Sequence, residues 1–503
     1  MILAAPLGLC VPSGPILLLY APQSGSGFIQ RPASGVFRAA SGSTKGMERL
    51  MRLHLLRHAM LLSVTLSMFD LSGQACAQSV PAGGPHALDG VIDGAAYSIR
   101  VPANWNGTLL VYARGYRTKS NRPDQPDDHR AFAAMSPREG FPQLPEMEEL
   151  LLVNGYAIAG SAYRDNGFAV EEAIEDTRQL VRLFRRQVGR PSRTIIYGVS
   201  MGALVALHAA ENPAGIYDGA ICACGIVAGT PLVTDLTSDF AAAYAAVFGW
   251  PRSWGDIGDV RDDLDFDTEV LPLLISQLQN SANMPRFEFI RLVTQSPLAG
   301  FYDGTKPGPW LVLNMFFATE GRAELEGRAG GPVTQNRDHT YSLTATGRQY
   351  LVSLGLNPDP LVAQLELNFR FSADKKARRY SESFYEPGGR LRVPTLTIHT
   401  VGDGLATPAN ARVLRENLKQ ARDSSLLHQA YTNDTGHCSF TSAQFLQAIQ
   451  AMERWVITGT QPRRDDFPAG LGFVPDFEPP AWPQPTRSRH RPGWLEAIPA
   501  DHE

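Results

Sequence analysis

Three residues of types that cooperate in acyl transfer stand out in this 503-residue chain: a serine, an aspartate and a histidine. Ser200 is the central residue of GVSMG (residues 198–202), which fits the pattern G-x-S-x-G. A serine hydroxyl becomes a nucleophile when an imidazole takes its proton and a carboxylate orients that imidazole. The serine pattern is therefore informative only if a suitable acid and base accompany it.

The surroundings of Ser200 meet the demands of that chemistry. Residues 193–197 (RTIIY) are β-branched or aromatic and predict a buried strand, and residues 201–211 are rich in Ala, Leu and Met and predict a helix. A serine on the sharp turn between strand and helix has its hydroxyl exposed. A serine that lies by chance between two glycines is the alternative, and the flanking elements favour the nucleophile.

Asp403 and His437 are the candidate acid and base. Asp403 ends the apolar run VPTLTIHTVGD (residues 393–403), and His437 follows the predicted strand LLHQAY (residues 426–431) by a few residues. Both therefore lie on loops at the carboxyl ends of strands, and the chain order is Ser, Asp, His.

Two other residues compete for these roles. Asp434 lies close to His437 in sequence, but a turn aspartate usually caps its own turn, and Asp403 is favoured because it ends a strand. His399 lies within the strand run, where a histidine buried in the core is the better interpretation.

The elements that must position these residues alternate between strand and helix. A parallel sheet covered on both faces, the doubly wound α/β class, is expected because the predicted strands are apolar throughout. The alternation stops between residues 230 and 392, where helical fragments mix with Gly/Pro-rich loops, so we expect an insertion there and a catalytic domain from residues 78–229 and 393–503. The predicted strands are 95–102, 107–113, 156–164, 193–197 and 393–403, and the predicted helices are 168–189, about 410–418 and 441–458.

Residues 95–459 resemble the α/β-hydrolase superfamily, and exported bacterial members in particular. The matching motifs are YGVSMGA, VGDGLATP and GHCSF. The resemblance implies a largely helical lid between strands 6 and 7 and a serine hydrolase that cleaves carboxylic esters through an acyl-enzyme, with Ser200, Asp403 and His437 as its triad. A serine peptidase or amidase, or a non-catalytic binding protein on the same fold, is the alternative.

The same architecture needs two backbone N–H groups directed at the developing oxyanion. The N–H of Met201, directly after the nucleophile and at a helix N-terminus, fits the first role. The second is expected from YARGYR (residues 112–117), with Tyr116 as the donor. This loop departs from the HGGG form of many esterases, and a bulky residue here suggests a differently shaped acyl pocket.

Cys438 follows His437 directly, as in tannases and feruloyl esterases, where a disulfide ties the histidine loop beside the nucleophile. Those families carry a cysteine next to the serine, whereas this chain has Val199. The resemblance therefore implies a partner in ICACG (residues 221–225). Cys222 and Cys224 face the same side by strand alternation, and Cys224 is favoured because it is nearer the carboxyl end. A bridge to Cys222, or free thiols, are the alternatives.

Composition and the N-terminus limit the partners and the location. A net charge of −4 predicts no nucleic-acid partner. Residues 47–77 are typical of a bacterial export signal cleaved before Gln78, and their apolar run is too short for stable membrane insertion, so a secreted or periplasmic protein is expected. Residues 1–46 are interpreted as a leader or an over-extended start without packed structure. No ligand motif for a metal or cofactor is present, and a small-molecule ester is the expected partner.

Overall fold

The computed structural model describes residues 86–119, 144–212, 215–298, 302–303, 306–307, 309–421 and 424–483. All of them belong to one compact unit, Ala77–Glu503. The expected leader at residues 1–46 and the expected export signal at residues 47–77 lie outside the described residues, so both remain predictions.

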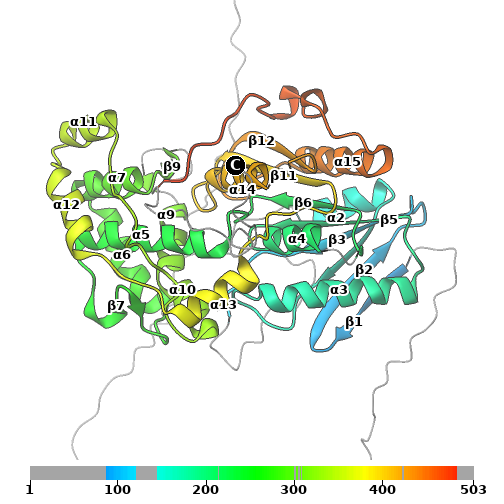
Figure 1. Cartoon of the computed structure of the whole chain (residues 1–503), viewed down its shortest axis with the longest axis horizontal. Coiled ribbons are helices and arrows are strands. Elements are labelled where there is room, and N and C mark those ends of the chain that lie inside the picture. The colour runs from blue at the N-terminus through cyan, green and yellow to red at the C-terminus, as the bar shows by residue number, and fades with distance from the viewer. Residues whose placement is uncertain are drawn as a thin grey trace, which may run out of the picture. The chain divides into compact units, whose positions relative to one another are not determined.

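An eight-stranded sheet forms the centre of the described chain (Figure 1). Its strand order is β1-β2-β4-β3-β5-β6-β11-β12. β1 pairs antiparallel with β2 and β2 antiparallel with β4, whereas all later pairs are parallel. The strands are β1 His86–Ile92, β2 Ala95–Val101, β3 Thr108–Ala113, β4 Ala157–Ser161, β5 Arg193–Val199, β6 Gly219–Ala223, β11 Thr395–Gly402 and β12 Leu427–Thr435.

Helices cover both faces of this sheet. Along β3, Leu109 and Val111 join the hydrophobic cluster shared with α3 (Val170–Gln187), α4 (Gly202–Glu211) and α14 (Ala409–Gln420). Leu110 and Tyr112 join the cluster shared with α2 (Leu144–Val153) and α15 (Ser442–Thr458). The strands are apolar throughout because each face is buried against helices, and this confirms the doubly wound α/β class expected from the sequence.

The segment between β6 and β11 is mostly helical, and its helices gather on one side of the sheet (Figure 1). Helix α5 packs against α7, α9, α12 and α13, so it is the centre of this segment. Its helices are α5 Thr230–Phe248, α6 Leu271–Gln279, α7 Met284–Val293, α9 Pro309–Ala318, α10 Glu320–Ala329, α11 Ala345–Ser353, α12 Asp359–Asn368 and α13 Lys375–Tyr385. Its short elements are η2 Arg252–Trp254, η3 Phe266–Val270 and η4 Ser281–Asn283, with the hairpins β7 Gly255–Asp256/β8 Asp259–Val260 and β9 Tyr302–Asp303/β10 Lys306–Pro307.

After α15 the chain returns across the edge strand β12. The N–H of Val474 donates to Tyr431 O at 2.8 Å, and Asn433 N–H donates to Gly472 O at 2.9 Å. Two short 3-10 turns, η5 Arg464–Asp466 and η6 Ala469–Leu471, lie in this segment. The segment around residues 472–474 thus covers the outer edge of β12 and protects this strand from pairing with other strands.

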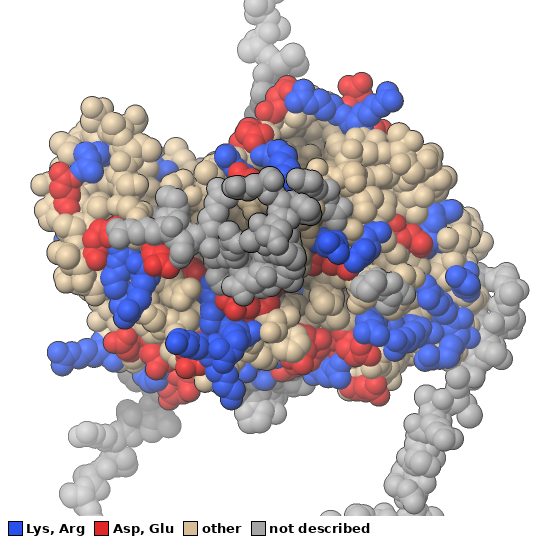
Figure 2. Space-filling model, viewed as in Figure 1, with Lys and Arg blue, Asp and Glu red and all other residues tan. Residues whose placement is uncertain are grey.

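The described surface carries mixed charge on the face shown in Figure 2, where basic and acidic side chains are interspersed. A search of the described helices for a stretch long and apolar enough to cross a membrane found none.

Candidate active site

The sharp turn after β5 places Ser200. Ser200 has φ +55°, a left-handed conformation that non-glycine residues rarely adopt, and its N–H donates to Ala223 O on β6 at 3.0 Å. Small neighbours are required for this turn. A Cβ at Gly198 would lie 1.9 Å from Gly202 O, and one at Gly202 would lie 2.1 Å from Ala113 O. The two glycines of G-x-S-x-G therefore permit the close contact of strand and helix.

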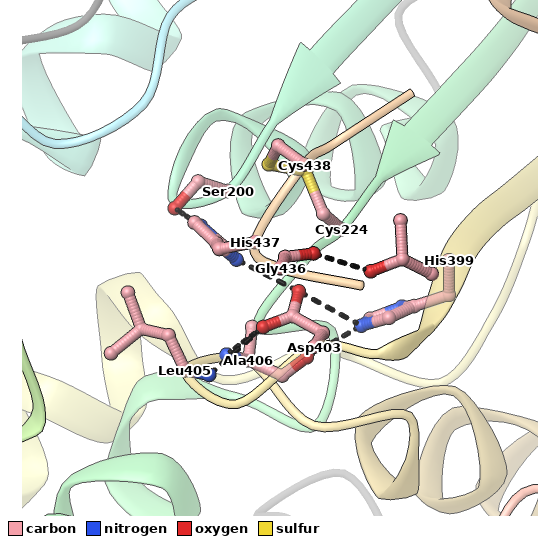
Figure 3. Close-up of a disulfide and its surroundings, with 10 residues drawn as sticks. Ser200, Cys224, His399, Asp403, Leu405, Ala406, Gly436, His437 and Cys438 are labelled. Carbon is pink, nitrogen blue, oxygen red and sulfur yellow. Dashed lines mark hydrogen bonds and ion pairs between the residues drawn. A yellow bond between two sulfur atoms is a disulfide. The ribbon is translucent and has the colours of Figure 1, made fainter. Parts of the chain in front are cut away.

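Ser200, His437 and Asp403 form one buried chain of hydrogen bonds (Figure 3). Ser200 Oγ lies 2.8 Å from His437 Nε2, and His437 Nδ1 lies 2.8 Å from Asp403 Oδ2. A carboxylate only accepts, so Nδ1 carries the imidazole proton and Nε2 accepts from the serine hydroxyl. This arrangement can move a proton from the serine oxygen to the ring.

Backbone groups hold Asp403 in place. Its Oδ1 accepts from the N–H groups of Leu405 and Ala406, both at 2.9 Å, and its other oxygen is left for His437. His399 Nε2–H donates to Ala406 O at 2.6 Å and lies 3.7 Å from Asp403 Oδ2. Burial lowers the pKa of His399. His399 therefore supports the aspartate loop as a neutral, buried histidine, the role expected for it.

Asp434, the competing acid, lies elsewhere. Its Oδ2 accepts from Gln444 Nε2 at 2.7 Å, and Gln444 forms the capping box of α15 with Thr441. The contact of Asp434 is thus with a side chain at the start of α15 and not with His437.

A disulfide joins Cys224, directly after β6, to Cys438, directly after His437 (Figure 3). Their Cα atoms are 5.1 Å apart. Cys222 is a buried free thiol whose pKa is raised by burial. The histidine loop has a second anchor because Thr400 Oγ1 donates to Gly436 O at 2.6 Å.

Met201 and Tyr116, the two expected oxyanion donors, line the same pocket as Ser200. Met201 is the N-cap of α4. Tyr116 lies in the loop after β3, and its ring packs edge-on against Phe168, Phe316 and Phe317.

A buried arginine that sequence reasoning missed organises this loop. Arg114 is fully buried and donates to Ala162 O, Asp165 O and Asn166 Oδ1 at 2.7 to 2.9 Å, which ties the loop after β3 to the loop after β4. Its guanidinium also lies 4.3 Å from the centre of the Tyr163 ring. An arginine directly after the apolar strand TLLVYA (residues 108–113) was the available signal, because a buried cation needs several acceptors.

The pocket above Ser200 has about 560 Å³ of empty space, counting the part open to solvent. The segment between β6 and β11 supplies much of its wall, and Trp310 of α9 lies edge-on to His437, with ring centres 5.9 Å apart. The sequence indicated four of the lining residues, Tyr116, Ser200, Met201 and His437, whereas no motif fixes how the segment between β6 and β11 folds. The lining residues are Tyr116, Phe168, Ser200, Met201, Ile226, Thr230, Val233, Thr234, Thr237, Phe317, Arg322, Leu405, Ala406 and His437.

Among the residues that the structure describes, one group has metal-ligand character: Cys224, His437 and Cys438. Both sulfur atoms are joined in the disulfide and both ring nitrogens of His437 are hydrogen-bonded, so the group has no thiolate to offer.

The strand order, the serine turn after β5, the aspartate loop after β11 and the histidine loop after β12 together define the fold. The protein has the fold of the α/β-hydrolase superfamily.

No family model matches the chain. An o-phthalyl amidase from Xanthobacter agilis is 24% identical over 426 residues, which are 74% of this chain and 87% of the amidase. Feruloyl esterase B from Aspergillus oryzae is similar in structure, with 14% identity, a TM-score of 0.38, and coverage of 76% of this chain and 86% of the esterase.

Two peptidases are also similar in structure. Proline iminopeptidase from Mycobacterium smegmatis has 10% identity and a TM-score of 0.36, and the match covers 75% of this chain and all of that one. Acylaminoacyl peptidase from Pyrococcus horikoshii has 13% identity and a TM-score of 0.33, with coverage of 71% of this chain and 38% of the peptidase. This chain thus spans well under half the length of that peptidase. The strand order identifies the fold, and these low scores add nothing to it.

Proposed function

We propose that this chain is a serine hydrolase in which Ser200 is the nucleophile, His437 the general base and acid, and Asp403 the residue that orients the imidazole. The observation that carries the proposal is the pair of 2.8 Å contacts from Ser200 to His437 and from His437 to Asp403, beside a pocket. Such a chain of contacts activates a hydroxyl that is otherwise a poor nucleophile.

The proposed reaction has two halves. Ser200 Oγ attacks the substrate carbonyl carbon while His437 Nε2 takes the hydroxyl proton, and the ring then gives that proton to the leaving group as the acyl-enzyme forms. Water, deprotonated by His437, attacks the acyl-enzyme and releases the acid. Asp403 remains ionised throughout and stabilises the imidazolium.

The negative charge that develops on the carbonyl oxygen needs donors already in position. We assign these to the N–H groups of Met201 and Tyr116. Met201 precedes the first turn of α4, so the helix dipole adds to its effect. The arginine that fixes the Tyr116 loop, Arg114, would act as a positioning residue.

Carboxylic esters are the proposed substrates, as expected from the sequence. Amides are the second candidate, because the relative that is 24% identical over 87% of its own length is an o-phthalyl amidase. The same three side chains could cleave an ester bond or an amide bond, since His437 can protonate an amine leaving group as well as an alcohol. The segment between β6 and β11 is proposed to act as a lid that sets the choice of acyl group.

A matched substrate pair decides between the two bonds. The purified protein is given the 4-nitrophenyl ester and the 4-nitroanilide of one aromatic acid, and release of the chromophore is followed. An esterase cleaves the ester with much the larger kcat/KM and leaves the anilide almost untouched. Comparable rates on both would assign the amide instead, and hydrolysis of neither, alongside binding of the acid, would favour a binding protein.

Ser200→Ala tests the nucleophile. Turnover of the ester should fall by about 10⁴-fold or more, because the residual rate comes from binding and the oxyanion donors alone. Thermal unfolding should stay near the wild-type midpoint. Ser98→Ala is the matched control, since Ser98 Oγ donates to Asp89 at the edge of the sheet, far from the pocket in sequence and fold. Near-normal turnover by Ser200→Ala would refute the mechanism.

A further inference from the structure

The pocket above Ser200 contains a buried cation that the proposed reaction does not use. Arg322, on α10, lines this pocket, and its side chain has no exposed surface. Apart from His437, it is the one lining residue with a basic side chain, and none of the described residues that line the pocket is acidic.

The guanidinium of Arg322 has more donors than acceptors. Nη2–H donates to Ile257 O at 2.8 Å, in the turn between β7 and β8. Nε forms an ion pair with Glu326 Oε1 at 3.5 Å but no hydrogen bond, and Nη1 has no hydrogen-bond partner in the described part of the chain. Buried polar groups are normally hydrogen-bonded, and an unsatisfied charged group is costly. Nε and Nη1 therefore lack a hydrogen-bond acceptor within the described chain.

A second residue with an unsatisfied polar atom lines the same pocket. Thr230 begins α5, is fully buried, and its Oγ1 has no hydrogen-bond partner. Most of the remaining wall is apolar or aromatic, including Tyr116, Phe168, Val233, Phe317 and Leu405. A few polar groups on an apolar wall are typical of a site that fixes the orientation of an apolar ligand with one polar end.

We propose that the pocket accepts substrates that carry a carboxylate in addition to the carbonyl attacked by Ser200, and that Arg322 binds this carboxylate. The inference rests on the proposed hydrolase function and narrows its substrate class. The planar guanidinium offers parallel N–H donors that match the two oxygens of a carboxylate, and a lysine in the same place would offer only a point charge.

Three acidic residues near Arg322 would compete with an anionic ligand for its charge. Asp256 and Asp259 lie on the adjacent hairpin, and Glu326 lies one helical turn away. Burial raises the pKa of the Glu326 carboxyl to about 7, against the opposing effect of Arg322. The raised pKa weakens the competition of the Glu326 carboxylate with a ligand for the guanidinium.

The kinetic test uses 4-nitrophenyl benzoate and its 2-, 3- and 4-carboxy derivatives, with the carboxamides as neutral equivalents. A second series, phenyl benzoate against the benzoate ester of 4-hydroxybenzoate, places the carboxylate on the leaving group. We expect one carboxylate position to give a kcat/KM well above that of its carboxamide. Arg322→Gln should lower that value about 100-fold and change the unsubstituted benzoate by less than about threefold.

Two further variants separate binding from structure. Arg322→Lys should recover only part of the preference, because it keeps the charge but loses the fork. Arg328→Gln is the matched control on the same helix, since Arg328 pairs with Asp165, Glu172 and Glu324 and does not line the pocket. Its ratio of carboxylate to carboxamide rates should equal that of the wild type. An equal loss on charged and neutral substrates in Arg322→Gln would overturn the proposal.

A binding measurement keeps this inference separate from the hydrolase proposal. Calorimetry on Ser200→Ala with the preferred benzenedicarboxylate, and with benzamide as the neutral probe, requires no turnover. We expect the dicarboxylate to bind and the affinity to fall at least tenfold when Arg322→Gln is added. Failure of the wild type to cleave any ester or amide would refute the hydrolase and leave this result standing, whereas equal affinities in the two proteins would refute the carboxylate site alone.

Discussion

Left-handed backbone conformations recur where strands of the sheet end, and Ser200 is one of the residues that adopt them. Five non-glycine residues with left-handed φ values follow directly or closely on sheet strands: Asp93 after β1, Tyr163 after β4, Ser200 after β5, Cys224 after β6 and Cys438 after β12. Each such conformation costs about 1–3 kcal/mol and persists only where surrounding contacts enforce it. The hydrogen bond from Ser200 N–H to Ala223 O of β6 and the Cys224–Cys438 disulfide supply such contacts. They hold the loops that carry these residues in a fixed conformation.

The acid of the proposed triad is tested by exchanging each candidate carboxylate for an amide. Asp403→Asn should lower kcat about 10⁴-fold, because the amide can donate to His437 and favour the wrong tautomer. Asp434→Asn should have little effect on kcat, since Asp434 bonds to Gln444 at the start of α15. Steady-state kinetics on one ester, with circular dichroism to check folding, compares the two. The reverse order would transfer the acid role to Asp434.

Sequence reasoning at this scale could indicate residues whose chemistry fixes their surroundings, and their catalytic role stays a prediction. Ser200, Asp403 and His437 could be paired because each follows a strand in a set order, and the structure brings them together. Arg114 and Arg322 could not be placed, because the acceptors of a buried arginine come from segments remote in sequence, such as Asn166 and Ile257. A buried cation is visible only once the fold has assembled its partners.

At the scale of elements, predictions held where burial or capping is strong. The helix expected at residues 441–458 is α15, which begins after the capping box at Thr441 and ends at Gly459 in a left-handed conformation. Strand β1 was missed because it is an edge strand, half-buried on one face and containing Gly90. The arrangement of helices α5 to α13 could not be predicted from the sequence either, since those helices pack mainly on one another.

The disulfide couples two loops, and its removal should act on both stability and rate. Cys438→Ser should lower the melting temperature and the activity together, because His437 is the adjacent residue and loses its tether. Chain-entropy models give about 3–5 kcal/mol for cross-links that close long loops, often an upper bound. Thermal denaturation and ester kinetics measure the two effects.

Cys222→Ser is the control for this pair. Cys222 is as deeply buried as Cys224 but unpaired, so its exchange should change the activity little. Mass spectrometry of a protease digest of the unreduced protein should detect a pair of peptides linked through Cys224 and Cys438. A Cys222–Cys438 peptide, or three free thiols, would contradict the pairing.

At the scale of the whole molecule, the disulfide bears on where the protein works. Structural disulfides form in oxidising compartments and are rare in the cytosol. The predicted export signal at residues 47–77 would deliver the chain to such a compartment, and the two features were inferred from separate parts of the sequence. We therefore propose that the protein is secreted or periplasmic, with a net charge of −4 that gives no reason to expect a nucleic-acid partner.

Cleavage of the export signal gives a direct test of this proposal. When the full chain is produced in a bacterial host, the mature protein should begin at Gln78, and a chain that starts at Met47 should give the same product, because the small residues at Ala75 and Ala77 direct the cleavage. Cell fractionation and N-terminal mass spectrometry provide the measurement. A chain that starts at Gln78 behind a new initiator methionine is the control: it should stay in the cytoplasm, contain reduced thiols and melt at a lower temperature until oxidised. Recovery of the full chain in the cytoplasm with residues 47–77 retained would contradict export. A reduced protein with the same melting temperature as the oxidised one would show that the fold does not depend on an oxidising compartment.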